Sequence, residues 1–406
     1  MSFHVARSGM NAATQDLNVT SHNIANSNTT GFKQSRAEFA DLFPVSTYGL
    51  SGNAVGAGVK LATVAQQFGQ GNVEFSGRAL DLAISGEGFF TLSDRGATVY
   101  SRAGNFGADD EGYVVNPAGH RLQVFPPNAS GTGFDTGRLG DLQLATGDAP
   151  PRASSRVGIG TNLPANAEVP AVSPFDAADP DSWNQTTSLT VYDSLGAAHT
   201  QTLHFVKTAN PNEWQVHTSI DGQPVGAPTT LQYSDTGTLA SPSPATVALD
   251  AFDPGNGAAP MQISLDMGGS SQYGDRFSVS SLSQDGHATG RLTGIEVTAE
   301  GVVQARYTNG VSTPLGQVAM TNFANPQGLQ SIGDNAWAQT ASSGDPRVGT
   351  AGSSEFGLVQ GGALEASNVD LTEQLVNMIT AQRNFQANAQ MISTQDQVTQ
   401  TVINIR

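Results

Sequence analysis

The chain has 406 residues, of which 38% are hydrophobic and only 13% are charged, against about 25% charged in an average globular protein. Its 35 acidic residues exceed its 18 lysines and arginines, and the net charge of −17 argues against a nucleic-acid partner, which needs clustered cations. The absence of cysteine removes disulfides, thiolate catalysis and metal sites built on Cys. No stretch is apolar over the roughly 20 residues of a membrane span. The N-terminus lacks the pattern of a cleavable signal peptide, so we expect a cytoplasmic chain or one exported without such a peptide.

The first 28 residues predict a helix. Phe3, Met10, Leu17 and Ile24 recur every seven residues, which is the spacing of a coiled-coil seam. The other positions of that seam follow three residues after the first three of these: Ala6, Ala13 and Thr20. The pattern stops in the segment 26–31, where Asn and Gly suit a helix end and a turn.

The middle of the chain predicts β-structure. Residues 33–71 are rich in glycine and are expected to form a connector, with 359–363 as its return segment. From 72 to 360 the sequence consists of short apolar runs separated by turn residues, such as the predicted hairpin turns 193–196 and 307–310. Stretches rich in Pro, Ala, Ser or Gly separate an inner β domain (72–145 and 286–358) from an inserted outer β domain (146–285).

The polar side chains of the middle region give no catalytic or metal-binding motif. The sequence contains neither H-E-x-x-H, nor G-x-S-x-G, nor a Walker A loop. His199 and His204 lie five residues apart on one predicted strand and therefore point to opposite faces. We expect the seven histidines to be ordinary surface or turn residues, and the carboxylates to serve mostly in turns. A glycosidase-like pair of carboxylates stays open, because it needs only two acids at the right separation.

The C-terminal residues predict a second, longer helix over 371–405. Apolar and small residues recur at alternating steps of four and three, with Gln382 as a polar interruption, and the stripe continues to Val398 and Val402. Asp370 is a suitable N-cap, and Glu373 three residues later completes a capping-box pattern. The two ends, 1–32 and 364–406, are therefore expected to form a helical coiled-coil assembly domain.

The polar faces of both predicted helices carry Asn, Gln, Ser and Thr rather than charged residues. Such helices are marginal alone, because packing stabilises helices more than propensity does. The simplest interpretation is an intramolecular pair of helices. The extreme positions of both seams and their low charge favour helices buried between subunits. The self-assembly seam is expected to consist of Phe3, Met10, Leu17, Ile24, Leu371, Leu375, Met378, Phe385, Ile392 and Val402.

Several motifs resemble those of a known family, the bacterial flagellar axial proteins (rod, hook and hook-associated proteins). Residues 8–13 and 23–33 resemble its N-terminal signature, and the core of that signature is intact in Ala25, Asn26, Thr29, Gly31 and Phe32. The run 367–373, followed by Met378, Arg383 and Phe385, resembles the other end of the family, and 80–90 with 100–106 resembles its first β domain. The segment 146–285 is similar to the extra outer domain of the family's hook members.

The resemblance implies a mainly β fold with α-helical termini and a structural role without catalysis. Subunits of the hook would polymerise helically into a curved hollow tube, a universal joint that transmits motor torque from rod to filament. The implied partners are further copies of the chain, the distal rod protein, the hook–filament junction protein, the hook cap and the flagellar export apparatus. No cofactor, small-molecule substrate or nucleic acid is expected. Export would use the flagellar type III route.

Two alternatives stay open at this point. A distal rod protein of the same family is the nearer one, although rod proteins are shorter and lack the inserted segment. The other belongs to a different class, a secreted β-rich carbohydrate-active enzyme or adhesin with helical ends.

Overall fold

The chain folds into two compact units. The computed structural model describes residues 2–43, 56–128, 133–144, 147–353 and 355–404. The first unit comprises Met1–Thr146, Gly294–Ala305 and Thr313–Arg406, and the second comprises Gly147–Thr293 and Arg306–Ser312. The segment 146–285, expected as an outer β domain, lies in the second unit except for its first residue. Because the helices and the remaining sheets share the first unit, the finer division of that unit stays a prediction.

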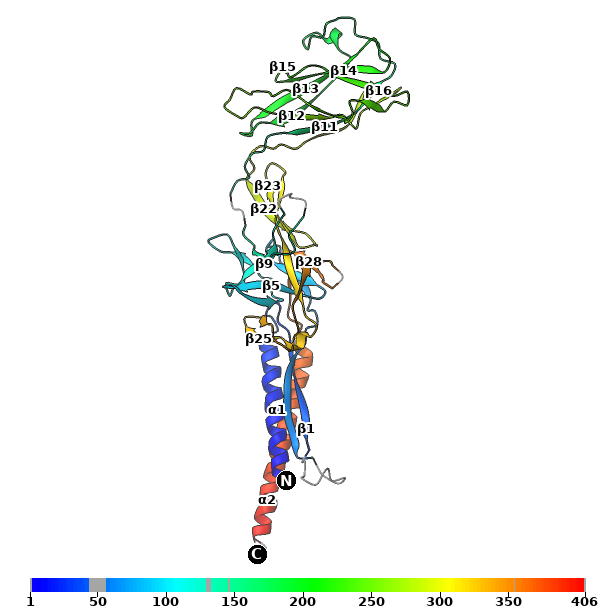
Figure 1. Ribbon diagram of the computed structural model, residues 1–406. Coiled ribbons are helices and arrows are strands. Elements are labelled where there is room, and N and C mark those ends of the chain that lie inside the picture. The colour runs from blue at the N-terminus through cyan, green and yellow to red at the C-terminus, as the bar shows by residue number, and fades with distance from the viewer. Residues whose placement is uncertain (1, 44–55, 129–132, 145–146, 354, 405–406) are drawn as a thin grey trace. The chain divides into compact units, whose positions relative to one another are not determined.

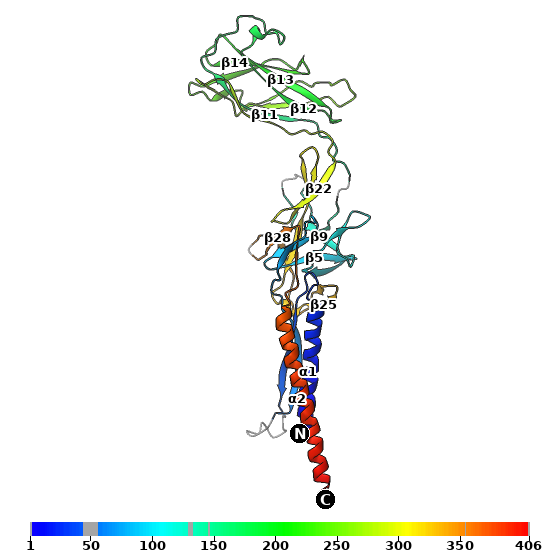
Figure 2. The ribbon, with the colours of Figure 1, turned by 180° about the vertical axis from the view of Figure 1, so that it is seen from behind.

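Both ends of the described chain are helical, α1 over Ser2–Ala25 and α2 over Leu371–Asn404. The two helices lie side by side (Figures 1 and 2). They are antiparallel, because Asn23 near the end of α1 meets Gln374 at the start of α2, whereas Gly9 faces Asn388 further along α2. With strands making up most of the remaining regular structure, the predicted fold class, mainly β with α-helical termini, is confirmed.

The helices contact each other through small and polar side chains. Ala6, Ala13 and Thr20 are buried on α1, and Gln374 and Ala381 are buried on α2. The space beside Gly9 is filled by the amide of Asn388. Short side chains at the contact allow two helix axes to approach closely.

The segment 33–71, expected to be a glycine-rich connector, contains a β-hairpin. Strand β1 (Ser35–Leu42) pairs antiparallel with β2 (Gly58–Gln66), and the hairpin runs beside α1 (Figure 1). The glycines that suggested a connector lie at or beyond the strand ends, so they do not interrupt the ladder. The expectation of a connector between the N-terminal helix and the β-structure stays a prediction, and the structure adds the two strands, which the composition of the segment did not indicate.

The rest of the first unit is β-structure around one main core. Its 12-stranded sheet, counted over the described residues, has the central order β22-β23-β24-β9-β5-β6-β26-β25. The strands of that order are β22 (Leu292–Val297), β23 (Val302–Tyr307), β24 (Ser312–Asn322), β9 (Arg121–Phe125), β5 (Phe89–Asp94), β6 (Ala97–Ser101), β26 (Ala336–Ala338) and β25 (Gln330–Gly333). The side strands are β7 (Gly107–Ala108), β8 (Val114–Val115), β10 (Gly140–Asp141) and β27 (Arg347–Thr350). A 3-10 turn, η2 (Pro326–Gly328), precedes β25.

Two short antiparallel pairs complete the first unit, β4 (Leu82–Ser85) with β28 (Leu358–Gly361), and β3 (Val73–Phe75) with β29 (Ala363–Glu365). Leu82, Phe90, Leu92, Leu122 and Val318 are among the buried residues of the core. Because β28 and β29 directly precede α2, these pairs attach the C-terminal helix to the β-structure.

The second unit is a β-sandwich. One sheet has the order β12-β13-β14-β16-β17 with β15 at β14, and the other has the order β18-β19-β11-β20 with β21 at β11. Phe205 and Trp214 of the first sheet pack in one core with Val157 and Leu265 of the second. The first sheet and the 3-10 turn before it comprise η1 (Pro180–Ser182), β12 (Gln185–Tyr192), β13 (Ala198–Lys207), β14 (Glu213–Ile220), β15 (Gln223–Pro224), β16 (Thr229–Tyr233) and β17 (Leu239–Ser241). The second sheet comprises β11 (Arg156–Pro164), β18 (Thr246–Ala248), β19 (Ser264–Asp266), β20 (Ser271–Tyr273) and β21 (Ser278–Gln284).

The predicted turns 193–196 and 307–310 are both present, and each is closed by a backbone hydrogen bond to its first residue. Among the described residues, no helix is long and apolar enough to cross a membrane.

Candidate assembly surface and the buried junction at its base

The side of α2 that faces away from α1 exposes large apolar residues. Leu371, Leu375, Val376 and Ile379 are 46%, 51%, 58% and 49% exposed. Their spacing of four, five and eight residues from Leu371 places them on one face of the helix. We call these four residues the α2 stripe. Monomeric proteins rarely expose apolar side chains in such a contiguous row, so the α2 stripe is a candidate contact surface.

The residues of the predicted seam do not all lie on one surface. Met10, Leu17, Ile24, Met378 and Ile392 are half-buried, whereas Phe3, Leu371, Leu375 and Phe385 are exposed. The side chain of Val402 lies outside the described residues. Within the monomer α1 packs on the row Gln374, Ala381 and Asn388, which also repeats every seven residues. Sequence reasoning passed over this row because its members are small or polar.

The predicted N-cap of α2 is present. The Oδ1 atom of Asp370 accepts hydrogen bonds from the backbone N–H groups of Thr372 (2.8 Å) and Glu373 (3.1 Å). The return bond of a capping box, from the Asp370 N–H to the Glu373 carboxylate, does not occur among the described residues. Asp370 alone therefore caps the helix.

The residues of the N-terminal signature form the turn that follows α1. Asn26 donates its side-chain amide to the carbonyl of His22 (2.9 Å), and Thr29 donates to Oδ1 of Asn26 (3.2 Å). Gly31 has a φ of +67°, and a Cβ atom there would overlap the backbone of Ala103. Only glycine satisfies both conditions. Phe32 is buried, and its ring lies 5.5 Å from that of His22.

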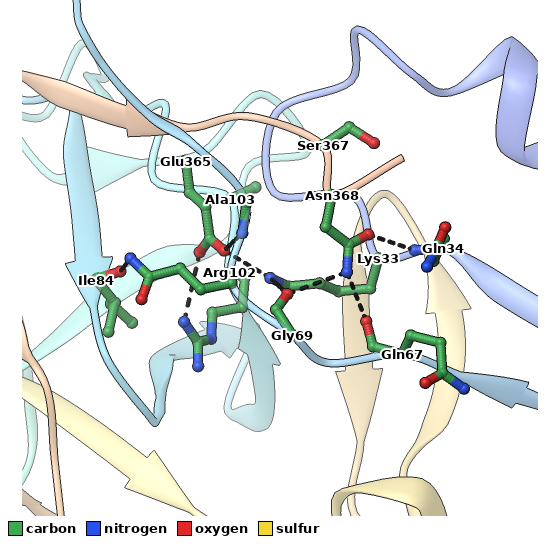
Figure 3. Close-up of polar contacts among 12 residues, drawn as sticks. Lys33, Gln34, Gln67, Gly69, Ile84, Arg102, Ala103, Glu365, Ser367 and Asn368 are labelled. Atoms are coloured by element: carbon green, nitrogen blue, oxygen red, sulfur yellow. Dashed lines mark hydrogen bonds and ion pairs between the residues drawn. The ribbon is translucent and has the colours of Figure 1, made fainter. Parts of the chain in front are cut away.

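A buried ion pair lies directly after this turn (Figure 3). The Nζ atom of Lys33 lies 2.6 Å from Oε1 of Glu365 and donates to the carbonyl of Gly69 at 2.8 Å. Nη1 of Arg102 lies 3.4 Å from Oε2 of the same carboxylate, and the N–H of Gly71 donates to Oε1 at 2.8 Å. The side chains of Lys33 and Glu365 are completely buried. Burial lowers the pKa of Lys33, and the Glu365 carboxylate opposes that shift.

Side-chain amides extend this junction toward the helices. Asn368 accepts from the backbone N–H of Gln34 (2.8 Å) and donates to the carbonyls of Gln67 (2.8 Å) and Gly69 (3.0 Å). Asn23 of α1 exchanges two hydrogen bonds with the backbone of Ser35 and donates to Gln374 of α2 at 3.1 Å. The end of α1, the start of β1 and the segment before α2 are therefore held to one another by polar contacts.

Sequence reasoning identified the signature but not the ion pair within it. In the sequence Lys33 is only the last residue of a motif. No local pattern pairs it with Glu365, because the two residues lie 332 positions apart. One signal was available, since the chain has only three lysines and one of them stands beside the signature.

The expectation of ordinary surface or turn positions is wrong for His199 and His204, which are buried on strand β13, whereas His120 is buried but closes a turn with Asn116. His120, His199 and His204 are each at most 9% exposed. His120 hydrogen-bonds to Asn116 four residues away, and His199 to Asp193 and Asp221, whereas Nδ1 of His204 has no hydrogen-bond partner among the described residues. Within the described part of the chain, no three His, Asp or Glu side chains gather in a way that could hold a metal ion.

Comparison with known proteins gives matches along most of the chain. Four family descriptions match in order: Flagella basal body rod protein (3–33), Flagellar hook protein FlgE/F/G D1 domain (83–173), Flagellar basal body protein FlaE D2 domain (162–287) and Flagellar basal body rod FlgEFG protein C-terminal (360–405). Over 413 residues, covering 100% of both chains, the sequence is 40% identical to the flagellar hook protein FlgE of Escherichia coli (strain K12). The chain belongs to the flagellar hook protein family.

Other relatives agree with this assignment. The hook protein FlgE of Rhizobium meliloti (strain 1021) is 34% identical, over 98% of this chain and 97% of that protein. The crystal structure of the Helicobacter pylori flagellar hook protein FlgE2 has a TM-score of 0.54 at 18% identity, covering 72% of this chain and 100% of that chain, and it shares the fold. The chain is thus a structural component of the bacterial flagellum. This decides against the distal rod protein and against the secreted enzyme or adhesin as the main interpretation.

Proposed function

We propose that copies of this chain polymerise helically into the curved, hollow tube of the hook. The terminal helices form the inner core of the tube and line its channel, and the second unit lies on the outside. The tube acts as a universal joint that passes motor torque from the rod to the filament while it bends. No residue carries out chemistry in this proposal.

The α2 stripe is the observation that carries the proposal. Its four apolar side chains face away from α1 in the monomer, and burying each of them against a neighbouring copy stabilises the contact by about 1–2 kcal/mol. The neighbouring polar positions hold Gln382, Gln386 and Gln390, which suit hydrogen bonds between subunits and a hydrated channel. A helix that needed only α1 as its partner would gain nothing from the α2 stripe.

The buried junction supports the mechanical part of the proposal. Torque that reaches the helices must pass to the β-structure through the segments around Lys33 and Glu365. These segments are linked by an ion pair and by several hydrogen bonds inside the first unit. Such a connection resists twisting of the helices against the sheets. Bending then falls to polar, hydrated contacts between the second units of neighbouring copies.

The proposal includes the neighbours and the route of the chain. The two ends of the assembled tube meet the distal rod protein and the hook–filament junction protein, and a hook cap covers the growing tube. The flagellar type III apparatus exports the chain in an unfolded state. The absence of cysteine suits this route, because no disulfide has to form or break along it.

Introducing a charge at exposed apolar positions of α2, at Leu375 within the α2 stripe and at Phe385 outside it, tests the proposal. Leu375→Asp and Phe385→Asp place a carboxylate on exposed positions of α2, so each variant keeps the fold of the monomer but loses polymerisation, since a carboxylate in an apolar contact is costly. Electron microscopy of concentrated protein and of hooks on cells measures the outcome. Asn384→Asp is the matched control, because it adds the same charge to the same helix away from the α2 stripe and leaves tube formation unchanged. Hooks of normal length from Leu375→Asp contradict the assembly surface.

A further inference from the structure

A histidine in the second unit lies between two carboxylates. His199 is in β13 and is 9% exposed. Its Nδ1 atom lies 2.6 Å from Oδ2 of Asp221, and its Nε2 atom lies 3.3 Å from Oδ2 of Asp193. Asp193 belongs to the turn between β12 and β13, and Asp221 to the turn between β14 and β15. The imidazole therefore connects two turns of one sheet.

Both carboxylates are held as acceptors by further donors. Oδ1 of Asp193 accepts from the backbone N–H groups of Leu195 and Ala197, both at 2.9 Å, and its Oδ2 accepts from the amide of Asn256 at 2.6 Å. Oδ1 of Asp221 accepts from the N–H of Thr200 at 2.8 Å. An ionised carboxylate can only accept, and a neutral imidazole carries a single N–H. A neutral His199 would turn one nitrogen lone pair toward a carboxylate oxygen.

We propose that His199 is held as an imidazolium between Asp193 and Asp221, so that the second unit folds with a bound proton that its unfolded chain lacks at neutral pH and loses stability as the solution becomes alkaline. The cation fastens the two turns, and through Asn256 the loop after β18, at one end of the sandwich. This property concerns the second unit alone and does not depend on the assembly proposal.

The electrostatic surroundings agree with this assignment. Burial alone would lower the pKa of His199, but its hydrogen bonds to Asp221 and Asp193 outweigh burial and raise the pKa above its ordinary value of 6.5. The raised pKa means that the stabilisation is fully present below pH 6.5 and disappears as the pH rises through the higher value of the folded state. The other neighbour is the ring of Phe252, which is uncharged and whose centroid lies 6.1 Å from that of the imidazole.

The two carboxylates determine the lower end of the pH range over which the contacts of His199 are stabilising. Burial tends to raise the pKa of Asp193, but the donors from Asn256, the backbone and His199 lower it to about 2. The His199 imidazole also lowers the pKa of Asp221. Their contribution is present above the ordinary aspartate pKa of 3.8 and is lost as the pH falls toward 2. Asp193, His199 and Asp221 are therefore all ionised, and the arrangement is stabilising, from mildly acidic pH up to the raised pKa of His199.

Two other histidines of the sandwich provide an internal contrast. His204 and His217 are cross-strand partners in β13 and β14, and the His217 ring stacks on Phe175 with centroids 3.9 Å apart. Neither forms a hydrogen bond to a carboxylate among the described residues, and burial lowers the pKa of both. They should therefore be neutral at a pH where His199 is charged.

Nitrogen-15 NMR of histidine-labelled, full-length protein tests the proposal directly, because the two ring nitrogens of an imidazolium have similar chemical shifts and those of a neutral ring do not. We expect the imidazolium pattern of one buried histidine to persist above pH 6.5, with a titration midpoint higher than those of His204 and His217. His199→Gln removes that signal, and Asp221→Asn lowers its midpoint. A titration midpoint of His199 at or below 6.5, or an unchanged midpoint in Asp221→Asn, overturns the proposal.

Thermal unfolding between pH 7 and 10 provides a second readout. The melting temperature of the second unit falls with rising pH in the wild type and stays nearly flat in His199→Gln. His287→Gln alters a histidine of the same unit that has no carboxylate partner among the described residues, and it keeps the wild-type slope. An identical alkaline slope in wild type and His199→Gln contradicts the proposal. If His199→Gln does not fold, the Asp221→Asn titration still decides.

Discussion

Lys33 is a buried lysine whose charge is neutralised by a residue from the other end of the chain. A buried ion pair contributes little net stability against a well-packed apolar pair, but removing one partner leaves a buried charge and is strongly destabilising. The geometry of the pair, with Gly69 and Gly71 supplying further hydrogen bonds, admits one arrangement of the segments. We therefore interpret the pair as a device that fixes how the chain ends meet the sheets.

Lys33→Met tests this interpretation. Methionine is similar in length but leaves Glu365 paired with Arg102 at 3.4 Å and leaves the buried Gly69 carbonyl without its lysine donor, so the free energy of unfolding of the first unit should fall by about 2 kcal/mol. Urea unfolding followed by tryptophan fluorescence measures the change. Arg36→Met is the control, because the pair between Arg36 and Glu38 is exposed and its loss costs at most about 1 kcal/mol. Equal losses in the two variants would contradict a special role for the buried pair.

At the scale of secondary structure, the closeness of α1 and α2 depends on Ala6, Ala13 and Ala381 being small. All three are buried in the contact, and any larger side chain there pushes the helices apart. The four residues of the α2 stripe remain exposed because this pairing does not cover them. In our proposal α2 thus has two contact faces, a small-residue face for its own chain and the α2 stripe for neighbouring copies.

Ala381→Leu probes the inner face. The added side chain overpacks the contact and should lower the free energy of unfolding of the helix pair by about 1–3 kcal/mol. Circular dichroism at 222 nm during heating measures this loss as an earlier melting of helix. Ala387→Leu, at an exposed position of the same helix, should melt like the wild type. Comparable early melting in both variants would show that the small residue at 381 is not required.

The sequence predicts these helices well because a seven-residue period and the cap Asp370 are local signals. It predicts the inner contact poorly, because Gln374 and Asn388 are polar and a search for apolar seams passes over them. The β-hairpin at 35–66 escaped prediction for a related reason, since nearby glycines dominated the composition of the segment. The Lys33–Glu365 pair and the environment of His199 depend on residues brought together by the fold, which no spacing rule reveals.

At the scale of the whole molecule, the main segment of the second unit, Gly147–Thr293, is an insertion that the chain enters and leaves through paired backbone. Ala149 and Gly290 exchange two hydrogen bonds, with N···O distances of 2.7 and 3.2 Å. The chain therefore returns close to the point where it departed. Such an insertion can be removed without cutting an element of the first unit.

Replacing residues 150–289 by two glycines closes that paired backbone with a short turn. The shortened chain should fold its first unit and assemble, but its tubes should be straighter or stiffer than wild-type hooks. In our proposal, contacts between the second units of neighbouring copies guide bending, and the shortened chain lacks them. Electron microscopy of the tubes and measurement of their curvature give the answer. Normal curvature in the shortened protein would refute the proposed role of the second unit.

The separation of 332 residues between Lys33 and Glu365 has a consequence for biosynthesis. A ribosome releases the lysine long before it makes the carboxylate, and α1 before it makes α2. Neither the charge nor the small-residue face of α1 has its partner in a growing polypeptide. Any product terminated before residue 365 lacks both the Glu365 carboxylate and α2, so premature termination yields chains that cannot complete their first unit. Folding of the complete first unit therefore requires a chain that has been synthesised through α2.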